Sequence, residues 1–231
     1  MVLGFCLAAV AAWMALPLIG PAGQAPQDRA LPAFGAAGDD LKIVALGTSL
    51  TASSRWPDDL EAELSRCLDQ PVQVSRVAVP GKGSAWALSM LDRVRDIRPD
   101  LVIVEFAIND ADLMGGVSLN RSRLQHDALL SGLRDLLPAQ AGILLMTTNP
   151  VTGVVRRLQR PALGSYYRQY RDLAAEHGTG LADLWPRWQA ALRHARLLPD
   201  GLHPGDAAAS RLIVPVLEAM IVAAYGDGQD C

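Results

Sequence analysis

The sequence predicts an α/β fold, a flavodoxin-like three-layer α/β/α sandwich built on a five-stranded parallel sheet in the order 2-1-3-4-5. Short apolar runs of strand length, each followed by turn residues, alternate five times with segments of helical periodicity. No two of these runs are joined by a hairpin-type turn. Alternation without hairpins is typical of a parallel sheet with helices on both faces.

The expected strands are apolar runs cut short by glycine, proline or polar residues. The first ends at Gly47, Thr48 and Ser49, and the third, the most β-branched, has the composition of a central parallel strand. The strands are predicted at 41–46, 72–79, 101–107, 143–148 and 180–184.

The expected helices show apolar residues at helical spacing between these runs. The first begins at Pro57 with acidic residues in its first turn, which is a typical helix start. The third stops before Pro138. The helices are predicted at 57–68, 84–97, 124–137, 162–177, 186–196 and 205–225.

Composition limits the class of protein. The chain has 231 residues, of which 50% are hydrophobic, enough for one sizeable core, and we expect a single domain over 41–225. The net charge of −3 leaves no basic surplus for phosphates, so nucleic acid is not an expected partner.

The N-terminal 25 residues differ from the rest. No charged side chain precedes Asp28, and an apolar run spans 2–19. We interpret 1–25 as a secretory signal peptide or an uncleaved membrane anchor. Export to the periplasm or medium is therefore expected, with membrane contact only through this segment, although an apolar tail retained in the cytosol fits the same pattern. Residues 26–40 are predicted to be a linker and 226–231 a C-terminal tail.

Polar residues follow the strand ends at Ser49, Gly81 and Asn109, and Asp200 and His203 lie three apart in a late turn. Because the carboxyl ends of parallel strands share one edge of a sheet, the topology gathers these residues. A serine nucleophile needs an imidazole base oriented by a carboxylate, which Asp200 and His203 supply. The Asn109 amide and the N–H groups of Gly81 and Ser49 are suitable donors to an oxyanion.

Each of these residues taken alone also fits an ordinary turn or cap. Their ordered occurrence at successive strand ends favours acyl-transfer chemistry. The motifs that resemble the four sequence blocks of the SGNH, or GDSL-type, hydrolase family are GTSLT at 47–51, VPG at 79–81, AIND at 107–110 and DGLHP at 200–204.

This resemblance implies the flavodoxin-like fold, Ser49 as nucleophile, His203 as base and Asp200 as its orienting acid. It also implies an oxyanion hole from Ser49, Gly81 and Asn109, with no metal or organic cofactor. The family's usual aspartate before the nucleophile and glycine in the third block are replaced here by a threonine and an alanine. Neither position is catalytic.

The expected function is that of an exported serine esterase acting through an acyl-enzyme on short-chain or O-acetyl esters, with a small molecule or polysaccharide as substrate. Alternatives with the same residues are lysophospholipid or thioester hydrolysis and O-acetyl transfer. A non-catalytic carbohydrate-binding module with the same fold is the alternative from another class.

Other side chains gave weaker hypotheses. Asp110 competes with Asp200 as the triad acid. The loop after the fourth strand, which carries Arg156, Arg157 and Arg160, either binds an anionic substrate or is simply solvated. The remaining histidines, His126, His177 and His194, are predicted to lie at the surface. Three side chains near the first two strand ends line either a pocket or the core, and these are Trp56, Lys82 and Trp86.

Removal of the N-terminal segment leaves two cysteines, Cys67 and Cys231. The expected topology packs the first and last helices side by side, which brings the two sulfurs to one end of the molecule. Because an exported chain meets an oxidising compartment, we expect a disulfide between them.

Overall fold

The computed structural model describes residues 25–225 of the chain. The expected signal peptide or anchor and the C-terminal tail therefore lie outside the described residues, except for Ala25. The sheet has five parallel strands in the order β2-β1-β3-β4-β5, so the predicted topology is confirmed. The strands are β1 (Leu41–Gly47), β2 (Val72–Ala78), β3 (Leu101–Glu105), β4 (Gly142–Thr147) and β5 (Gly180–Asp183).

The sheet is buried on both faces because its strands are apolar at nearly every position. Successive side chains of a strand point to opposite faces. Ile43 and Ala45 of β1 accordingly belong to one hydrophobic cluster, and Val44 and Leu46 to the other. The two clusters form the two interfaces of a three-layer sandwich.

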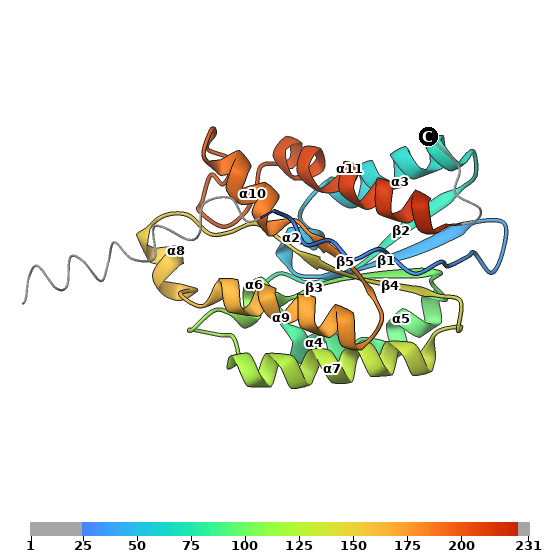
Figure 1. The fold of residues 1–231 in the computed structure, drawn as a ribbon, viewed down its shortest axis with the longest axis horizontal. Coiled ribbons are helices and arrows are strands. Elements are labelled where there is room, and N and C mark those ends of the chain that lie inside the picture. The colour runs from blue at the N-terminus through green and yellow to red at the C-terminus, as the bar shows by residue number, and fades with distance from the viewer. Residues whose placement is uncertain (1–24, 226–231) are drawn as a thin grey trace, which may run out of the picture.

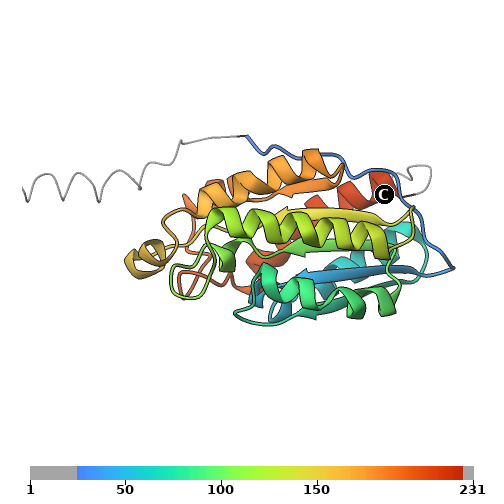
Figure 2. The ribbon, with the colours of Figure 1, turned by 90° about the horizontal axis from the view of Figure 1, so that it is seen from below.

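One layer holds α3, α10 and α11, and the opposite layer holds α4, α5, α7 and α9, as Figures 1 and 2 show. Short helices follow several strand ends at the carboxyl edge. The helices are α2 (Ser49–Ala52), α3 (Trp56–Leu68), α4 (Ser84–Ser89), α5 (Leu91–Ile97), α6 (Ala107–Asp110), α7 (Leu119–Leu136), α8 (Val154–Gln159), α9 (Leu163–Glu176), α10 (Trp185–Leu192) and α11 (Asp206–Ala224).

Several helical predictions need correction: the short helices α2 and α6 were not predicted, and α10 ends at Leu192 rather than at residue 196. The helix expected at 84–97 is divided into α4 and α5 at Met90, whose N–H bonds the carbonyl of Ala87. Helix α7 begins at Leu119 because Ser118 caps it, its hydroxyl accepting from the N–H of Arg121. Helix α8 was not predicted, since it has no buried residue and so no apolar periodicity.

The segment expected to be a linker packs on the domain instead. Arg29 pairs antiparallel with Leu181 of the edge strand β5, and Phe34 forms a bridge with Tyr225. Leu31 and Phe34 are 6% exposed and belong to the hydrophobic cluster under α11. This segment covers one edge of the sheet, which protects unpaired backbone groups of β5.

Helices α3 and α11 lie side by side, as the topology predicts. Cys67 near the end of α3 is disulfide-bonded. Cys231, its expected partner, lies outside the described residues, so this pairing stays a prediction. Helix α11 is long and apolar enough to cross a membrane by length and composition, yet Leu217 and Ile221 are fully buried in the core.

Candidate active site

Three side chains from the two ends of the domain form a chain of hydrogen bonds at the carboxyl edge of the sheet. Ser49 Oγ lies 2.8 Å from His203 Nε2, and His203 Nδ1 lies 2.7 Å from Asp200 Oδ2. Because a carboxylate can only accept, His203 donates from Nδ1 and its Nε2 lone pair faces the Ser49 hydroxyl. This is the tautomer needed for a base that removes the serine proton.

Asp200 is fixed by its own turn. Its Oδ1 accepts from the backbone N–H groups of Leu202 and His203, at 2.9 and 2.7 Å. Burial raises the pKa of Asp200, but the hydrogen bonds from the His203 side chain and from these two N–H groups outweigh it and hold the pKa far below its usual value. The carboxylate therefore stays ionised beside the imidazole.

The turn that carries Asp200 and His203 is fixed by the loop after β4. Gly201 has φ of +80°, and a Cβ there would meet the carbonyl oxygen of Thr152. Thr152 N–H donates to Gly201 O at 2.8 Å, and Asn149 Nδ2 donates to Leu202 O, also at 2.8 Å. The loop after β4 thus positions the turn of Asp200 and His203, which lies about fifty residues further along the sequence.

Ser49 is the first residue of α2, directly after β1. Thr48 caps this helix by accepting from the N–H of Leu50 at 3.1 Å. This is the position at which the family usually has aspartate, and threonine also serves as a helix cap. The cap fixes the serine at the strand-to-helix turn, where its hydroxyl faces His203.

Glu105, at the end of β3, lies directly beneath this turn and is 2% exposed. Its Oε1 accepts from Thr48 N at 2.6 Å and from Thr51 Oγ1 at 2.7 Å, and Thr48 Oγ1 lies 3.0 Å away. Burial raises the pKa of Glu105 to about 7, although these hydrogen bonds lower it. A side chain at Gly47 would clash with this carboxyl group, which accounts for the glycine there.

The three oxyanion donors expected from the sequence are the N–H groups of Ser49 and Gly81 and the side-chain amide of Asn109. Ser49 and Gly81 give no backbone N–H bond to an acceptor within the described residues. Gly81 has φ of +75°, a conformation that L side chains rarely adopt. Asn109 Nδ2 donates one hydrogen to the carbonyl of Lys82 at 2.9 Å, which orients the amide and leaves its second hydrogen available.

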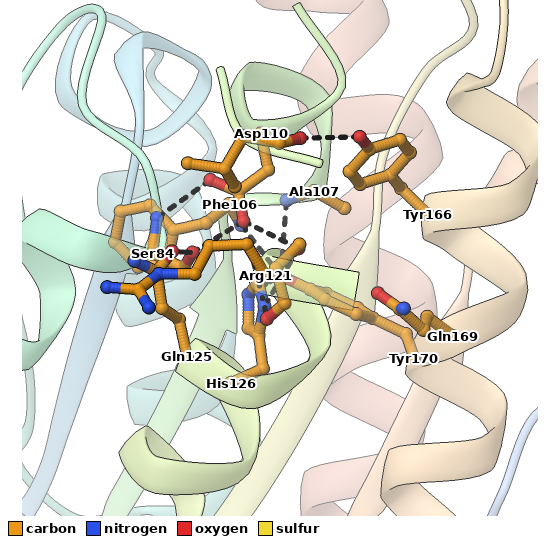
Figure 3. A network of polar contacts seen from close by, with 12 residues as sticks. Ser84, Phe106, Ala107, Asp110, Arg121, Gln125, His126, Tyr166, Gln169 and Tyr170 are labelled. Carbon is orange, nitrogen blue, oxygen red and sulfur yellow. Dashed lines mark hydrogen bonds and ion pairs between the residues drawn. The ribbon is translucent and has the colours of Figure 1, made fainter. Parts of the chain in front are cut away.

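Asp110, on α6, is buried, and its carboxylate joins α6 to Ser84 at the start of α4. Figure 3 shows the two side chains close together. The Asp110 carboxylate accepts from Ser84 N–H at 2.9 Å, from Ser84 Oγ at 2.5 Å and from Ser122 Oγ at 2.6 Å. The hypothesis of Asp110 as the triad acid is therefore wrong: Asp110 binds serines, and the histidine nearest to it is His126 rather than His203.

His126 is also buried, so its predicted surface position is wrong. Burial lowers the pKa of His126 despite the nearby Asp110, which keeps the ring neutral. Its Nδ1 donates to Ser122 O at 2.9 Å, so Nε2 accepts from the hydroxyl of Tyr170 at 2.9 Å. That hydroxyl in turn accepts from the N–H groups of Phe106 and Ala107, at 2.8 and 3.2 Å (Figure 3). These bonds fix the start of α6.

Residues 43–211 match the model of the GDSL-like lipase/acylhydrolase family. The chain belongs to this family. It is accordingly a serine ester hydrolase of the SGNH type, as the four sequence blocks imply. A comparison with curated proteins finds no match.

Solved structures of other proteins have the same fold. Axe2, an acetylxylan esterase from Geobacillus stearothermophilus, is 19% identical with a TM-score of 0.68, covering 81% of this chain and 95% of that one. TesA is 20% identical with a TM-score of 0.62, covering 78% and 97%. LAE5, an α/β hydrolase from the metagenome of Lake Arreo, Spain, is 20% identical with a TM-score of 0.68, covering 84% and 99%.

The other residues singled out from the sequence of this GDSL-family chain lie outside the Ser49–His203–Asp200 chain of hydrogen bonds. Trp56 is buried, its Nε1 donating to Leu50 O, so it packs in the core; Trp86 packs on Phe106. His177 pairs with Asp127, and His194 is exposed, as predicted. Arg160 is buried and ion-paired with Asp112 at 2.6 Å, so it is not part of a solvated loop.

Four residues that support the site through hydrogen bonds were not predicted from the sequence: Thr51, Glu105, Asn149 and Tyr170. Each acts through a contact with a segment far along the chain, and none lies in a local pattern with that partner. A charged residue inside the apolar run 101–107 was the one available signal, because an acid in a central strand must find buried donors.

Proposed function

We propose that this chain hydrolyses carboxylic esters with Ser49 as nucleophile, His203 as general base and Asp200 as the group that orients His203. The observation that carries the proposal is the hydrogen-bonded chain from Ser49 Oγ through both ring nitrogens of His203 to Asp200. The oxyanion donors in the proposal are the N–H groups of Ser49 and Gly81 and the side chain of Asn109.

In the first step Ser49 Oγ attacks the ester carbonyl carbon while its proton passes to His203 Nε2. The carbonyl oxygen becomes an oxyanion bound by the three donors. Collapse breaks the bond to the alcohol oxygen, which takes the proton from His203 and leaves. A water molecule then repeats the sequence on the acyl-enzyme, which releases the carboxylic acid and restores the Ser49 hydroxyl.

We infer that the substrates are short-chain or O-acetyl esters, including acetylated polysaccharide. The side chains of His203 and Asp200 are 42% and 45% exposed, so the reacting ester meets an open, solvated edge. A bulky polar alcohol can stay in water there, whereas a long acyl chain needs apolar cover. The acetylxylan ester activity given for Axe2 is of the same class.

We further propose that the protein is exported to the periplasm or medium. The uncharged apolar run at 2–19 and the disulfide at Cys67 support this, because stable disulfides form mainly in oxidising compartments.

The test is hydrolysis of p-nitrophenyl esters from acetate to palmitate by the full chain and by Ser49→Ala. Ser53→Ala is the matched control, since it removes an exposed hydroxyl four residues away. We expect Ser49→Ala to lose activity by a factor on the order of 10³ or more, and Ser53→Ala to keep it.

The acyl preference is read from the same series. Acetate is expected to be the best substrate. A preference for palmitate would overturn the short-chain proposal in favour of a lysophospholipase-like enzyme. Full activity in Ser49→Ala would overturn the assignment of Ser49 as the nucleophile. Release of p-nitrophenol that occurs only when a sugar is added, with the acetyl group recovered as an ester of that sugar, would favour the transferase alternative.

A further inference from the structure

The most exposed large apolar side chains of the described residues gather on two adjacent segments. Helix α8 exposes Val154 by 75%, Val155 by 68% and Leu158 by 64%, and the loop after α6 exposes Leu113 by 71% and Met114 by 83%. The segments are joined by a hydrogen bond from Leu113 N–H to Gln159 O at 2.8 Å. We call these five side chains the apolar tip. Clustered exposure of this kind marks an interaction surface.

The apolar tip lies at the catalytic edge of the sheet. Helix α8 follows β4 and projects from one end of the molecule in Figure 1. Arg156 within α8 lies 3.9 Å from Asp200, and Thr152 just before it bonds Gly201. Whatever binds the tip therefore lies beside the triad. Because the tip is a projecting helix and loop, it is suited to a broad surface rather than to enclosing one acyl chain.

The polar groups of the tip are cationic. Arg157 is exposed and has no ion pair within the described part of the chain, and Arg156 is half-buried on the same helix. The nearby carboxylate of Asp112 is neutralised by the buried Arg160 at 2.6 Å. Apolar side chains beside an arginine without an ion pair among the described residues, here Arg157, are typical of interfacial segments that bind anionic lipid surfaces.

The described chain begins at the same edge, where the N–H of Gln27 donates to Asp183 at the carboxyl end of β5. Twenty-four residues precede Ala25 in the sequence. These residues contain the apolar run 2–19, which is long enough to be a signal peptide or anchor. They contain no acidic residue, so this segment offers no partner to Arg157. An anionic bilayer offers both an apolar interior and negative charge.

We propose that the apolar tip docks on an anionic phospholipid bilayer and holds the catalytic edge at the membrane surface. Val155 and Leu158 enter the interface between headgroups and acyl chains, and Arg157 binds lipid phosphate. The surface serves the mature chain whether the N-terminal segment is cleaved or retained, and it goes beyond the hydrolysis proposed above.

The test is hydrogen–deuterium exchange of the full chain in two vesicle types, phosphatidylcholine alone and phosphatidylcholine with about one third phosphatidylglycerol. Any anchoring by the apolar N-terminus is present in both, so only lipid charge differs. We expect amide exchange in α8 to slow by a factor of about ten or more in the anionic vesicles. Amide exchange in α5, which lies toward the opposite end of the molecule from α8 in Figure 1, is expected to stay unchanged.

Leu158→Asp is expected to abolish this slowing. Leu124→Asp is the matched control, because Leu124 is an exposed leucine on α7, 55% exposed against 64% for Leu158. It should keep the slowing. Hydrolysis of a soluble ester by both variants confirms folding, since neither residue belongs to the catalytic machinery. Arg157→Gln, which keeps the apolar side chains, is expected to weaken the slowing and to lower its sensitivity to salt.

Equal exchange of α8 in both vesicle types would overturn the proposal, as would slowing that survives in Leu158→Asp. If amide exchange in α8 is already slow without lipid and slows further as protein concentration rises, a second copy of the chain covers the apolar tip instead. If exchange in α8 is slow without lipid at every protein concentration, the N-terminal segment covers the apolar tip.

Discussion

Asp110 and Ser84 are joined by two hydrogen bonds, from Ser84 N–H at 2.9 Å and from Ser84 Oγ at 2.5 Å. Asp110 directly follows Asn109, and Ser84 lies three residues after Gly81. The two bonds therefore fix the distance between two of the proposed oxyanion donors. The contact depends on Gly83 as well, because a Cβ there would strike the Asp110 carboxylate.

We predict that Asp110→Ala lowers kcat more than it raises KM, because misplaced donors bind the oxyanion less well than the ground-state ester. It also leaves the buried Ser84 N–H and Ser122 hydroxyl without the acceptor they have in the wild type, at a cost of about 2 to 3 kcal/mol in unfolding free energy, whereas Ser84 Oγ keeps Gln125 Oε1. Steady-state kinetics and urea unfolding measure the two effects. Asp127→Ala, which removes an exposed acid on α7, is expected to change neither.

Asn109 gives a sharper test of the oxyanion site. Asn109→Ala removes one donor and is expected to lower kcat by a factor of about 10² to 10³ with little change in KM. Because its side chain is bonded only to the carbonyl of Lys82 in the described structure, stability should fall by about 1 kcal/mol at most. A rise in KM with kcat unchanged would assign Asn109 to substrate binding instead.

Much of this site was predictable because its residues follow strand ends. Apolar runs that stop before Ser49, Gly81 and Asn109 predict that these residues lie at one edge of a parallel sheet, and the family resemblance implies the strand order. The supporting residues were not predictable in this way. Glu105, Asn149 and Tyr170 bind backbone or hydroxyl groups of distant segments, and His126 is buried only because α7 and α9 pack together.

Glu105 is expected to make stability depend on pH near neutrality. Its pKa is raised by burial from 4.5 to about 7, so the folded state binds more protons than the unfolded state between these values. Stability contributed by the protonated carboxyl is present below about pH 4.5 and is lost as pH rises to about 7, by roughly 3 kcal/mol at most.

The measurement is urea unfolding of the wild type and of Glu105→Gln across this pH range. Glutamine keeps the shape of the side chain without its charge. The difference in unfolding free energy, wild type minus variant, is expected to decrease from pH 4.5 to 7 and then level off. The difference cancels His126, whose lowered pKa acts in the opposite sense in both proteins. A difference that is constant with pH would contradict the raised pKa.

The disulfide at Cys67 has a specific predicted partner. Since α3 and α11 lie side by side, we expect Cys67 to be linked to Cys231. Proteolysis without reduction, followed by mass spectrometry, should give one peptide pair joining α3 to the C-terminal peptide. A link from Cys67 to Cys6 would show that the N-terminal segment is retained and would refute the predicted pairing.

The central claim is that Ser49, activated by His203 and Asp200, forms the covalent bond to the acyl group. The most direct measurement is mass spectrometry of the full chain after reaction with a fluorophosphonate, which forms a stable adduct with an activated serine. We predict one adduct, located on the peptide that contains Ser49, and its loss in His203→Ala. An adduct on another residue, or ester hydrolysis that continues at full rate in the labelled protein, would contradict the account.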